Sequence, residues 1–395
     1  MDGDVPAASD RDLWFPLRVY AAAAAVVIFV SILAHAWLRP LHSGHRALQG
    51  RAWFHAFTWW DGWWYTGIAE NGYGFFSTTR QSPVAFFPGY PLLMRLLGPA
   101  VGGSQLAGFG LTVICGLGAA VLFHRWCTRM FGPPTARLAV GLLVLYPFAF
   151  YLMGAVYGDA LFLLTVVGAF LAFEDDRPVA AGLLAAVASA TRPVGIAVVL
   201  GLWVLALERR DLVRQVRTDG YASLRRSFRR ADFGLLLAPS GLAAYCLFLW
   251  VRFGRPLAFL EAGSARGWDQ PPGLRTWLKL RWFGTMAHGP WGNGHASHLL
   301  INAAAAVVAA APVPQVFRQL GLGYGVFVFV AVVLTSVATK DFVGMGRYTL
   351  AAFPCFGVAA GILVQRPMLK RVVVVGSAVG LIILAQLHAR GTLVS

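Results

Sequence analysis

The feature that most constrains this chain is a series of apolar stretches that recurs from one end to the other. A transmembrane helix needs about 20 mostly apolar residues, and several of these stretches reach that length. Of all residues 58% are hydrophobic and only 13% are charged, which lies outside the range of soluble domains. The sequence therefore predicts an all-α, polytopic membrane protein. The apolar windows are residues 17–37, 106–124, 137–153, 157–173, 179–207, 233–252, 297–311, 323–338, 347–365 and 372–388.

Basic residues between these windows predict the orientation of the chain. Segment 208–232 carries eight arginines, which marks it as cytoplasmic under the positive-inside rule, and segments 124–137 and 365–371 are basic as well. We therefore expect a cytoplasmic N-terminus, an outer C-terminus and two long outer loops at 38–105 and 253–296, in a bacterial plasma membrane. The formal charge of +16 is explained by these loops, so no nucleic-acid partner is expected.

The window 179–207 poses a topological problem, because the segments on both sides of it should be cytoplasmic. At its middle lies "SATRPVG", which contains Arg192 and Pro193. Proline interrupts a helix, and an arginine at the centre of a bilayer is costly. We therefore expect two short helices, about 179–190 and 194–207, that meet near the outer face. This gives about eleven helical segments.

These expectations describe one integral-membrane domain of residues 1–395, with a bundle of transmembrane helices and interfacial helices in its first outer loop. Its expected parts are a first transmembrane helix at 17–37, the outer loop 38–105, helices over 106–252 that include the broken pair, the outer loop 253–296, and C-terminal helices over 297–395.

The ionisable residues that solvation explains least gather on the predicted outer side. Such groups at membrane level are candidates for a functional site and should pair with one another. Alternatives stay open: Asp61 as a helix cap, Asp159 as a charge favoured at a helix N-terminus, and the arginines as residues that extend to the interface. The candidates are Asp61, Glu70, Asp159, Arg192, Lys340, Asp341 and Arg347.

The stretch from Trp59 to Phe76 surrounds Asp61 with four tryptophans. Helical spacing places Asp61, Trp64 and Tyr65 on one face. Tryptophans prefer the membrane interface, so this stretch is predicted to be an interfacial helix that holds Asp61 at a fixed depth. An aromatic belt with a solvated aspartate is the alternative interpretation.

Neither a metal nor an organic cofactor is indicated. The four cysteines show no zinc spacing and no disulfide framework. His288, His295 and His298 lie close in sequence, but their spacing fits no familiar ligand motif, so a polar loop is favoured over a metal site.

Four segments in order carry a family resemblance: "WDGWWYTGIAENGY" (60–73), "AFFPGYPLL" (85–93), "YGDALF" (157–162) and "ATRPVG" (190–195). They resemble successive signature segments of the PIG-V mannosyltransferases, a family within the GT-C class of multi-helix membrane glycosyltransferases. The likeness covers about residues 50–200 and is weaker beyond, where "GRYTLAAFP" (346–354) continues it. Asp159 stands where many relatives have Glu, and the chain is compact beside the eukaryotic members, which argues against a GPI-type acceptor.

The resemblance implies transfer of a sugar, mannose in the family, from a polyprenyl-phosphate donor to a lipid, glycan or protein acceptor on the extracytoplasmic side. It implies Asp61 as general base. Asp159 is the second candidate catalytic residue and could orient an arginine or bind the sugar. Arginine binds phosphate through paired donors, so Arg192 and Arg347, with Lys340, are expected to bind the donor phosphate. The aromatic residues expected to position substrate are Trp60, Trp64, Tyr65, Tyr157 and Tyr348.

Two other classes of protein stay open. A transporter or flippase for a lipid-linked or anionic substrate would also have broken helices and charges at membrane level. Such proteins are typically built from internal repeats with charges near the midplane, whereas the two halves of this chain do not resemble each other. The second of these classes is a non-catalytic membrane subunit. Such a subunit would not need Asp61, Asp159 and Arg192 together.

Overall fold

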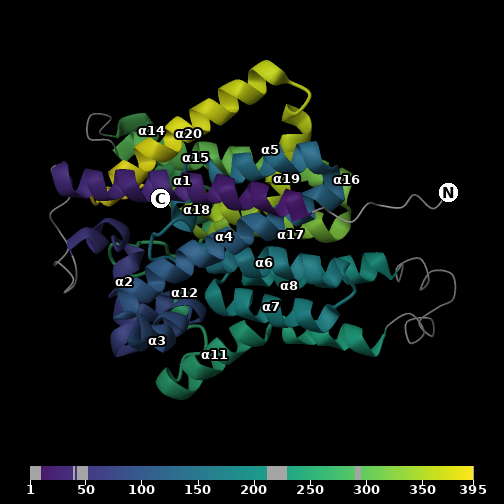
Figure 1. The fold of residues 1–395 in the computed structure, drawn as a ribbon. Coiled ribbons are helices and arrows are strands. Elements are labelled where there is room, and N and C mark those ends of the chain that lie inside the picture. Colours follow the sequence, from purple (N-terminus) through teal and green to yellow (C-terminus); the bar gives the residue numbers. More distant parts are fainter. Residues whose placement is uncertain (1–9, 39–40, 42–51, 211–228, 290–294, 395) are drawn as a thin grey trace, which may run out of the picture.

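The computed structural model describes residues 10–38, 41, 52–210, 229–289 and 295–394 (Figure 1). Every regular element within these residues is an α-helix or a 3-10 helix. The long helices are α1 (Asp10–Trp37), α4 (Ser104–Phe131), α5 (Pro133–Val144), α6 (Asp159–Glu174), α7 (Pro178–Thr191), α8 (Gly195–Arg209), α11 (Ser240–Phe253), α15 (His295–Ala310), α17 (Leu322–Ala338), α19 (Phe353–Leu363) and α20 (Pro367–Ala389).

The apolar character and length of these helices make the chain an integral membrane protein. Among the described residues, four helices are long and apolar enough to cross a bilayer, or up to six if two bent pairs each count as one span. Shorter apolar helices, α5, α7 and α17, add to the bundle. The predicted all-α membrane fold is confirmed, and the count of eleven segments stays a prediction. The four are Leu13–Trp37, Ser104–Phe131, Ala296–Leu320 and Pro367–Ala389.

The centre of the bundle is formed by α4, α6, α7, α8 and α17, with α6 buried along most of its length (Figure 1). Large aromatic side chains fill the space between them. The buried indole of Trp126 on α4 donates a hydrogen bond to the Tyr324 hydroxyl on α17 at 2.9 Å. This satisfies a polar group that would otherwise be costly inside the bundle.

The break that the sequence predicts in window 179–207 lies between α7 and α8. Arg192 has an extended backbone (φ −152°, ψ 148°) and Pro193 follows it. A residue before proline avoids helical conformation, and proline cannot donate to the preceding turn. The two helices therefore meet at a turn that carries the Arg192 side chain.

Further helices gather at one end of the bundle, on the left in Figure 1. Four of them are α2 (Asp61–Asn71), α3 (Gly89–Val101), α12 (Ala258–Ala262) and α14 (Leu280–His288). With α13 (Leu274–Trp277) and α18 (Met345–Tyr348) they belong to the segments that the charge pattern assigns to the outer side. At the opposite end, α6 and α8 approach each other at Glu174 and Arg209, which form an ion pair at 2.8 Å.

Candidate active site

Asp61 is the first residue of α2, and the turn before it is unusual. Trp60 has φ 57° and ψ −112°, a conformation that bulky residues rarely adopt. The Tyr157 hydroxyl accepts a hydrogen bond from the Asp61 backbone N–H at 3.1 Å and donates one to the Trp59 carbonyl at 2.9 Å. Tyr157 thus fixes the start of α2 and the position of the Asp61 side chain.

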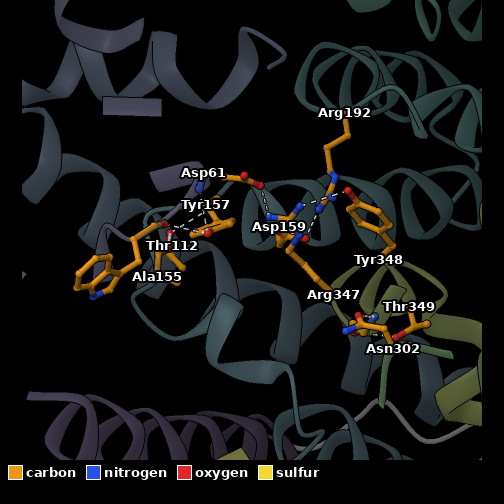
Figure 2. A network of polar contacts seen from close by, with 12 residues as sticks. Asp61, Thr112, Ala155, Tyr157, Asp159, Arg192, Asn302, Arg347, Tyr348 and Thr349 are labelled. Carbon is orange, nitrogen blue, oxygen red and sulfur yellow. Dashed lines mark hydrogen bonds and ion pairs between the residues drawn. The ribbon is translucent and has the colours of Figure 1, made fainter. Parts of the chain in front are cut away.

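Four charged side chains from distant parts of the sequence form a chain of alternating sign (Figure 2). Arg347 on α18 donates from Nη1 to Asp61 Oδ2 at 2.6 Å, and its Nε lies 3.9 Å from Asp159 Oδ2. Asp159, the first residue of α6, also accepts a hydrogen bond from Arg192. The four side chains therefore alternate in the order Asp61, Arg347, Asp159 and Arg192. We call them the outer ion-pair cluster, after the side of the membrane that the charge pattern predicts for them.

The outer ion-pair cluster is largely removed from solvent. The side chain of Asp159 is 4% exposed, that of Arg347 9% and that of Arg192 11%, whereas that of Asp61 is 28% exposed. Burying a charge costs several kcal/mol even when it is paired. A cluster that is so buried and yet reaches solvent at one carboxylate is typical of a functional site.

Tyrosine rings surround the two guanidinium groups. The Tyr348 ring centroid lies 4.7 Å from Cζ of Arg192 and 5.1 Å from Cζ of Arg347, distances suited to cation–π attraction. Arg347 also lies over Tyr157 at 5.0 Å. Burial raises the pKa of the Tyr65 and Tyr157 phenols well above their ordinary value, so both remain neutral hydroxyls at physiological pH.

A cavity of about 660 Å³ opens beside the cluster, and we call it the first cavity. Its charged end is formed by Asp61 and Arg192, with Tyr348 beside Arg192, and Gln270 and three threonines add neutral polar groups to the lining. Arg347 does not line it, because this side chain lies behind Asp61. Most of the remaining wall is apolar, so the cavity combines a charged end with a hydrocarbon-like remainder. Apolar lining residues include Ile196, Leu242, Phe259, Leu260, Leu334 and Val337.

Most of the residues predicted from the sequence come together here. The outer ion-pair cluster, Tyr157 and Tyr348 are in mutual contact, and Tyr65 packs its ring edge-on against Tyr157 at 6.2 Å. Trp64 lies one layer away and stacks on Phe86 at 5.6 Å.

Lys340 and Trp60 do not line the first cavity. Both line a second cavity of about 750 Å³. Lys340 Nζ donates to the Trp268 carbonyl at 2.7 Å and lies 3.6 Å from Asp269 Oδ2, and burial lowers its pKa. The reason for this separation from Arg347 is a reversal of the backbone, in which Phe342 (φ 64°) and Gly344 (φ 89°) have left-handed conformations.

Sequence reasoning missed the residues that support the site from behind. Asn302 on α15 is fully buried, accepts a hydrogen bond from the Gly346 N–H at 3.0 Å and donates to the Val394 carbonyl at 3.2 Å. It therefore fixes the backbone that carries Arg347 (Figure 2). The one indication of this role in the sequence was that Asn302 is a lone amide in an alanine-rich apolar window.

A metal site is not formed by the part of the chain that the structure describes. There, no group of three or more His, Cys, Asp or Glu side chains is arranged to hold an ion. His288 and His298 are among these side chains, whereas the side chain of His295 lies outside the described part.

No protein-family model matches the chain, and no curated protein sequence matches it. Among solved structures it is similar to ArnT from Cupriavidus metallidurans bound to undecaprenyl phosphate, with 15% identity, a TM-score of 0.49, and coverage of 88% of this chain and 60% of that one. It is also similar to the Archaeoglobus fulgidus oligosaccharyltransferase in complex with Zn and sulfate, with 14% identity, a TM-score of 0.42, and coverage of 94% and 53%. The chain thus spans between half and two thirds of these proteins. Similarities this distant assign no activity.

Proposed function

We propose that this protein is a membrane glycosyltransferase that moves a sugar from a polyprenyl-phosphate donor to an acceptor hydroxyl on the extracytoplasmic side. The observation that carries the proposal is the first cavity, where a carboxylate and a guanidinium stand at the polar end of an otherwise apolar space. The four sequence segments that resemble the PIG-V family supply Asp61, Asp159 and Arg192, and the same resemblance suggests mannose as the sugar.

A lipid-linked donor fits both halves of this cavity. Its isoprenoid chain would lie against Leu242, Phe259 and Leu334, where apolar surface is removed from water. Its phosphate would meet Arg192, which stays charged and offers paired donors to phosphate oxygens. The Tyr348 hydroxyl lines the same end and is placed to add a further hydrogen bond.

Asp61 is placed to act as the general base. Its Oδ2 accepts from Arg347, and among the described residues none donates to its Oδ1. In the step we propose, the acceptor oxygen bonds to the anomeric carbon and its proton passes to Asp61. The bond from that carbon to the phosphate oxygen breaks, and its electron pair leaves with the phosphate. The oxocarbenium-like transition state is stabilised by the adjacent carboxylate.

In this scheme the rest of the outer ion-pair cluster positions the reacting groups. Arg347 holds the Asp61 carboxylate in one orientation, which replaces its expected role as a phosphate ligand. Asp159 does the same for Arg192. Two buried side chains thus fix the two that reach the cavity, so that little reorganisation is needed when substrate binds.

The proposal is tested by incubating the purified protein with polyprenyl-phosphate-mannose and a panel of lipid, glycan and peptide acceptors. We expect release of polyprenyl phosphate together with a mannosylated product. Polyprenyl-phosphate-glucose is the matched control for the sugar, and GDP-mannose is the control for the lipid. A folded protein that cleaves none of these donors would contradict the proposal.

A further inference from the structure

The second cavity lies directly beside the first, and the two share the wall formed by Trp268 and Gln270. Its other sides are formed by Leu41, by Trp60, by Arg281, by the first half of α15, by Lys340, Asp341 and Val343, and by residues of α20 and the segment that follows it. Trp60 and Asp61 are consecutive in sequence but line different cavities. The left-handed backbone of Trp60 turns the two side chains apart, and conformational strain of this kind concentrates at functional sites.

Positive and negative side chains are equal in number in the described lining of the second cavity. The charged residues among its described lining are the cations Arg281 and Lys340 and the anions Asp269 and Asp341, two of each sign. Lys340 is already engaged with Trp268 and Asp269, so it stabilises the shared wall and is not available as a phosphate ligand. The second cavity therefore favours a neutral, hydrogen-bonding ligand over an anionic one.

Asp341 is a buried carboxylate of this wall with unused hydrogen-bonding capacity. It is 5% exposed, and the hydrogen bond that the described residues give its carboxylate is a long one, 3.4 Å, from the Val343 N–H. A carboxylate can accept about four hydrogen bonds, and buried polar groups are normally satisfied. A ligand hydroxyl in the cavity would supply the missing partners.

Trp60 and Trp268 bring large aromatic surfaces to the same cavity. Aromatic faces pack against the C–H groups of a sugar ring, while carboxylates and amides bind its hydroxyls. Asp341 and Gln270 are such groups, and Gln270 also borders the first cavity. A hydroxyl held at this wall would be directed toward Asp61.

We propose that the second cavity is the acceptor site and that its ligand is a neutral carbohydrate, recognised by Asp341 and Gln270 and by the rings of Trp60 and Trp268. This inference rests on the proposed transfer reaction and deepens it, since it selects a glycan among lipid, glycan and peptide acceptors. Asp61 lines the first cavity, so the acceptor hydroxyl would reach it past Gln270, which borders both cavities.

The test uses octyl α-D-mannopyranoside as the carbohydrate probe and a threonine-containing octanoyl peptide as the competing acceptor. Ile301→Trp fills the second cavity from α15, and Asp341→Asn removes the carboxylate. Val308→Trp, exposed on the same helix, and Glu261→Gln, on α12 outside both linings, are the matched controls. Thermal unfolding shows that each variant is folded.

We expect the KM for octyl mannoside to rise at least tenfold in Ile301→Trp and in Asp341→Asn and to stay at the wild-type value in both controls. An unchanged KM in both cavity variants, or exclusive use of the peptide, would overturn the inference. Binding of octyl mannoside, measured by saturation-transfer NMR without donor, gives the same comparison independently of turnover. Donor hydrolysis by the wild type tests the proposed transferase activity without any acceptor. The transferase activity and the acceptor site can therefore fail separately.

Discussion

The two ends of α6 each carry an ion-pair cluster, and the clusters differ in kind. Asp159 opens the helix and Glu174 closes it, about 23 Å away at 1.5 Å per residue. At the Glu174 end, Arg125 and Arg129 pair with Asp175, and Arg209 pairs with Glu174, but all three arginines are largely exposed. At the Asp159 end both arginines are buried beside tyrosine rings, and Arg192 borders the first cavity.

This difference separates structural charges from functional ones. Exposed pairs contribute little to stability, and at the Glu174 end the arginines follow the pattern that sets orientation in a membrane. Buried pairs carry a desolvation cost, so the outer ion-pair cluster is hard to explain by stability alone. The first two predictions test its burial and its contact with the cavity, the third compares how charged groups at the two ends respond to pH, and the fourth tests the exposed cluster.

The largest effect on stability is expected from Asp159→Asn. It leaves Arg192 and Arg347 buried with one carboxylate between them, and breaking a buried pair costs about 3–5 kcal/mol. Thermal unfolding in detergent measures this loss of stability. The control is Asp232→Asn at the opposite end, because the side chain of Asp232 is also buried and paired with Arg210. Both variants should unfold at lower temperature, but only Asp159→Asn should lose transfer when assayed below both transitions. Equal loss of transfer would contradict the distinction.

Arg192→Ala should weaken donor use about 10- to 100-fold, as expected for a lost charge-assisted contact of about 1.5–3 kcal/mol. The apparent affinity for polyprenyl-phosphate-mannose is the quantity to measure. Arg209→Ala removes an exposed arginine from the other end and should leave this affinity unchanged. Unaltered donor affinity in Arg192→Ala would argue against a phosphate role.

The stability contributed by charged groups at the two ends of the bundle should also depend on different ranges of pH. Lys279, between α13 and α14, is buried and donates to the carbonyls of Ser336 and Thr339 at the end of α17. Burial lowers the pKa of Lys279 from 10.5 to about 8, although Asp341 opposes this shift. Between these values the unfolded chain binds a proton that the folded chain does not. Stability should therefore rise with pH from about 8, by up to about 1.4 kcal/mol per pH unit.

Lys279→Met should remove most of this rise, and Lys340, whose pKa is lowered in the same direction, should account for the remainder. Lys370→Met, at the start of α20, is the matched control. At the other end of α6, hydrogen bonds from Arg210 and Arg229 lower the pKa of Asp176, so any contribution from that carboxyl is lost only as the pH falls toward acid values. Melting temperatures across pH 7–9.5 that are identical in the wild type and Lys279→Met would contradict the assignment.

The smallest effect is expected from Asp175→Asn. Its partners Arg125 and Arg129 are largely exposed, and exposed pairs are worth about 0.2–1 kcal/mol. The melting temperature should change little and transfer should be unaffected. A loss of stability or of transfer as large as that in Asp159→Asn would contradict the contrast between the two ends of α6.

The sequence was sufficient to predict the helical membrane architecture, the break at Arg192 and the gathering of Asp61, Asp159, Arg192 and Arg347. These predictions depend on hydropathy, on proline and on the distribution of arginine, all of which act locally. Which partner each charge takes could not be predicted in the same way. Arg347 pairs with a carboxylate 286 residues away.

Lys340 illustrates the limit most clearly. It lies only seven residues before Arg347, yet it lines the second cavity whereas Arg347 pairs with Asp61 behind the first, because Phe342 and Gly344 reverse the backbone between them. Left-handed conformation at a phenylalanine has no signal in sequence. Asn302, the support of α18, was equally hidden, since its role depends on contacts with residues 346 and 394.

The most direct test of the central claim is the rate of sugar transfer by Asp61→Asn, measured together with donor binding and melting temperature. The substitution keeps the size of the side chain and removes the base. We expect transfer to fall about 10²- to 10⁴-fold, while donor binding stays close to that of the wild type. The melting temperature should fall, because buried Arg347 loses the carboxylate that it contacts at 2.6 Å, but the protein should remain folded at the assay temperature. Transfer at nearly the wild-type rate in a folded, donor-binding Asp61→Asn protein would contradict the assignment of Asp61 as the base.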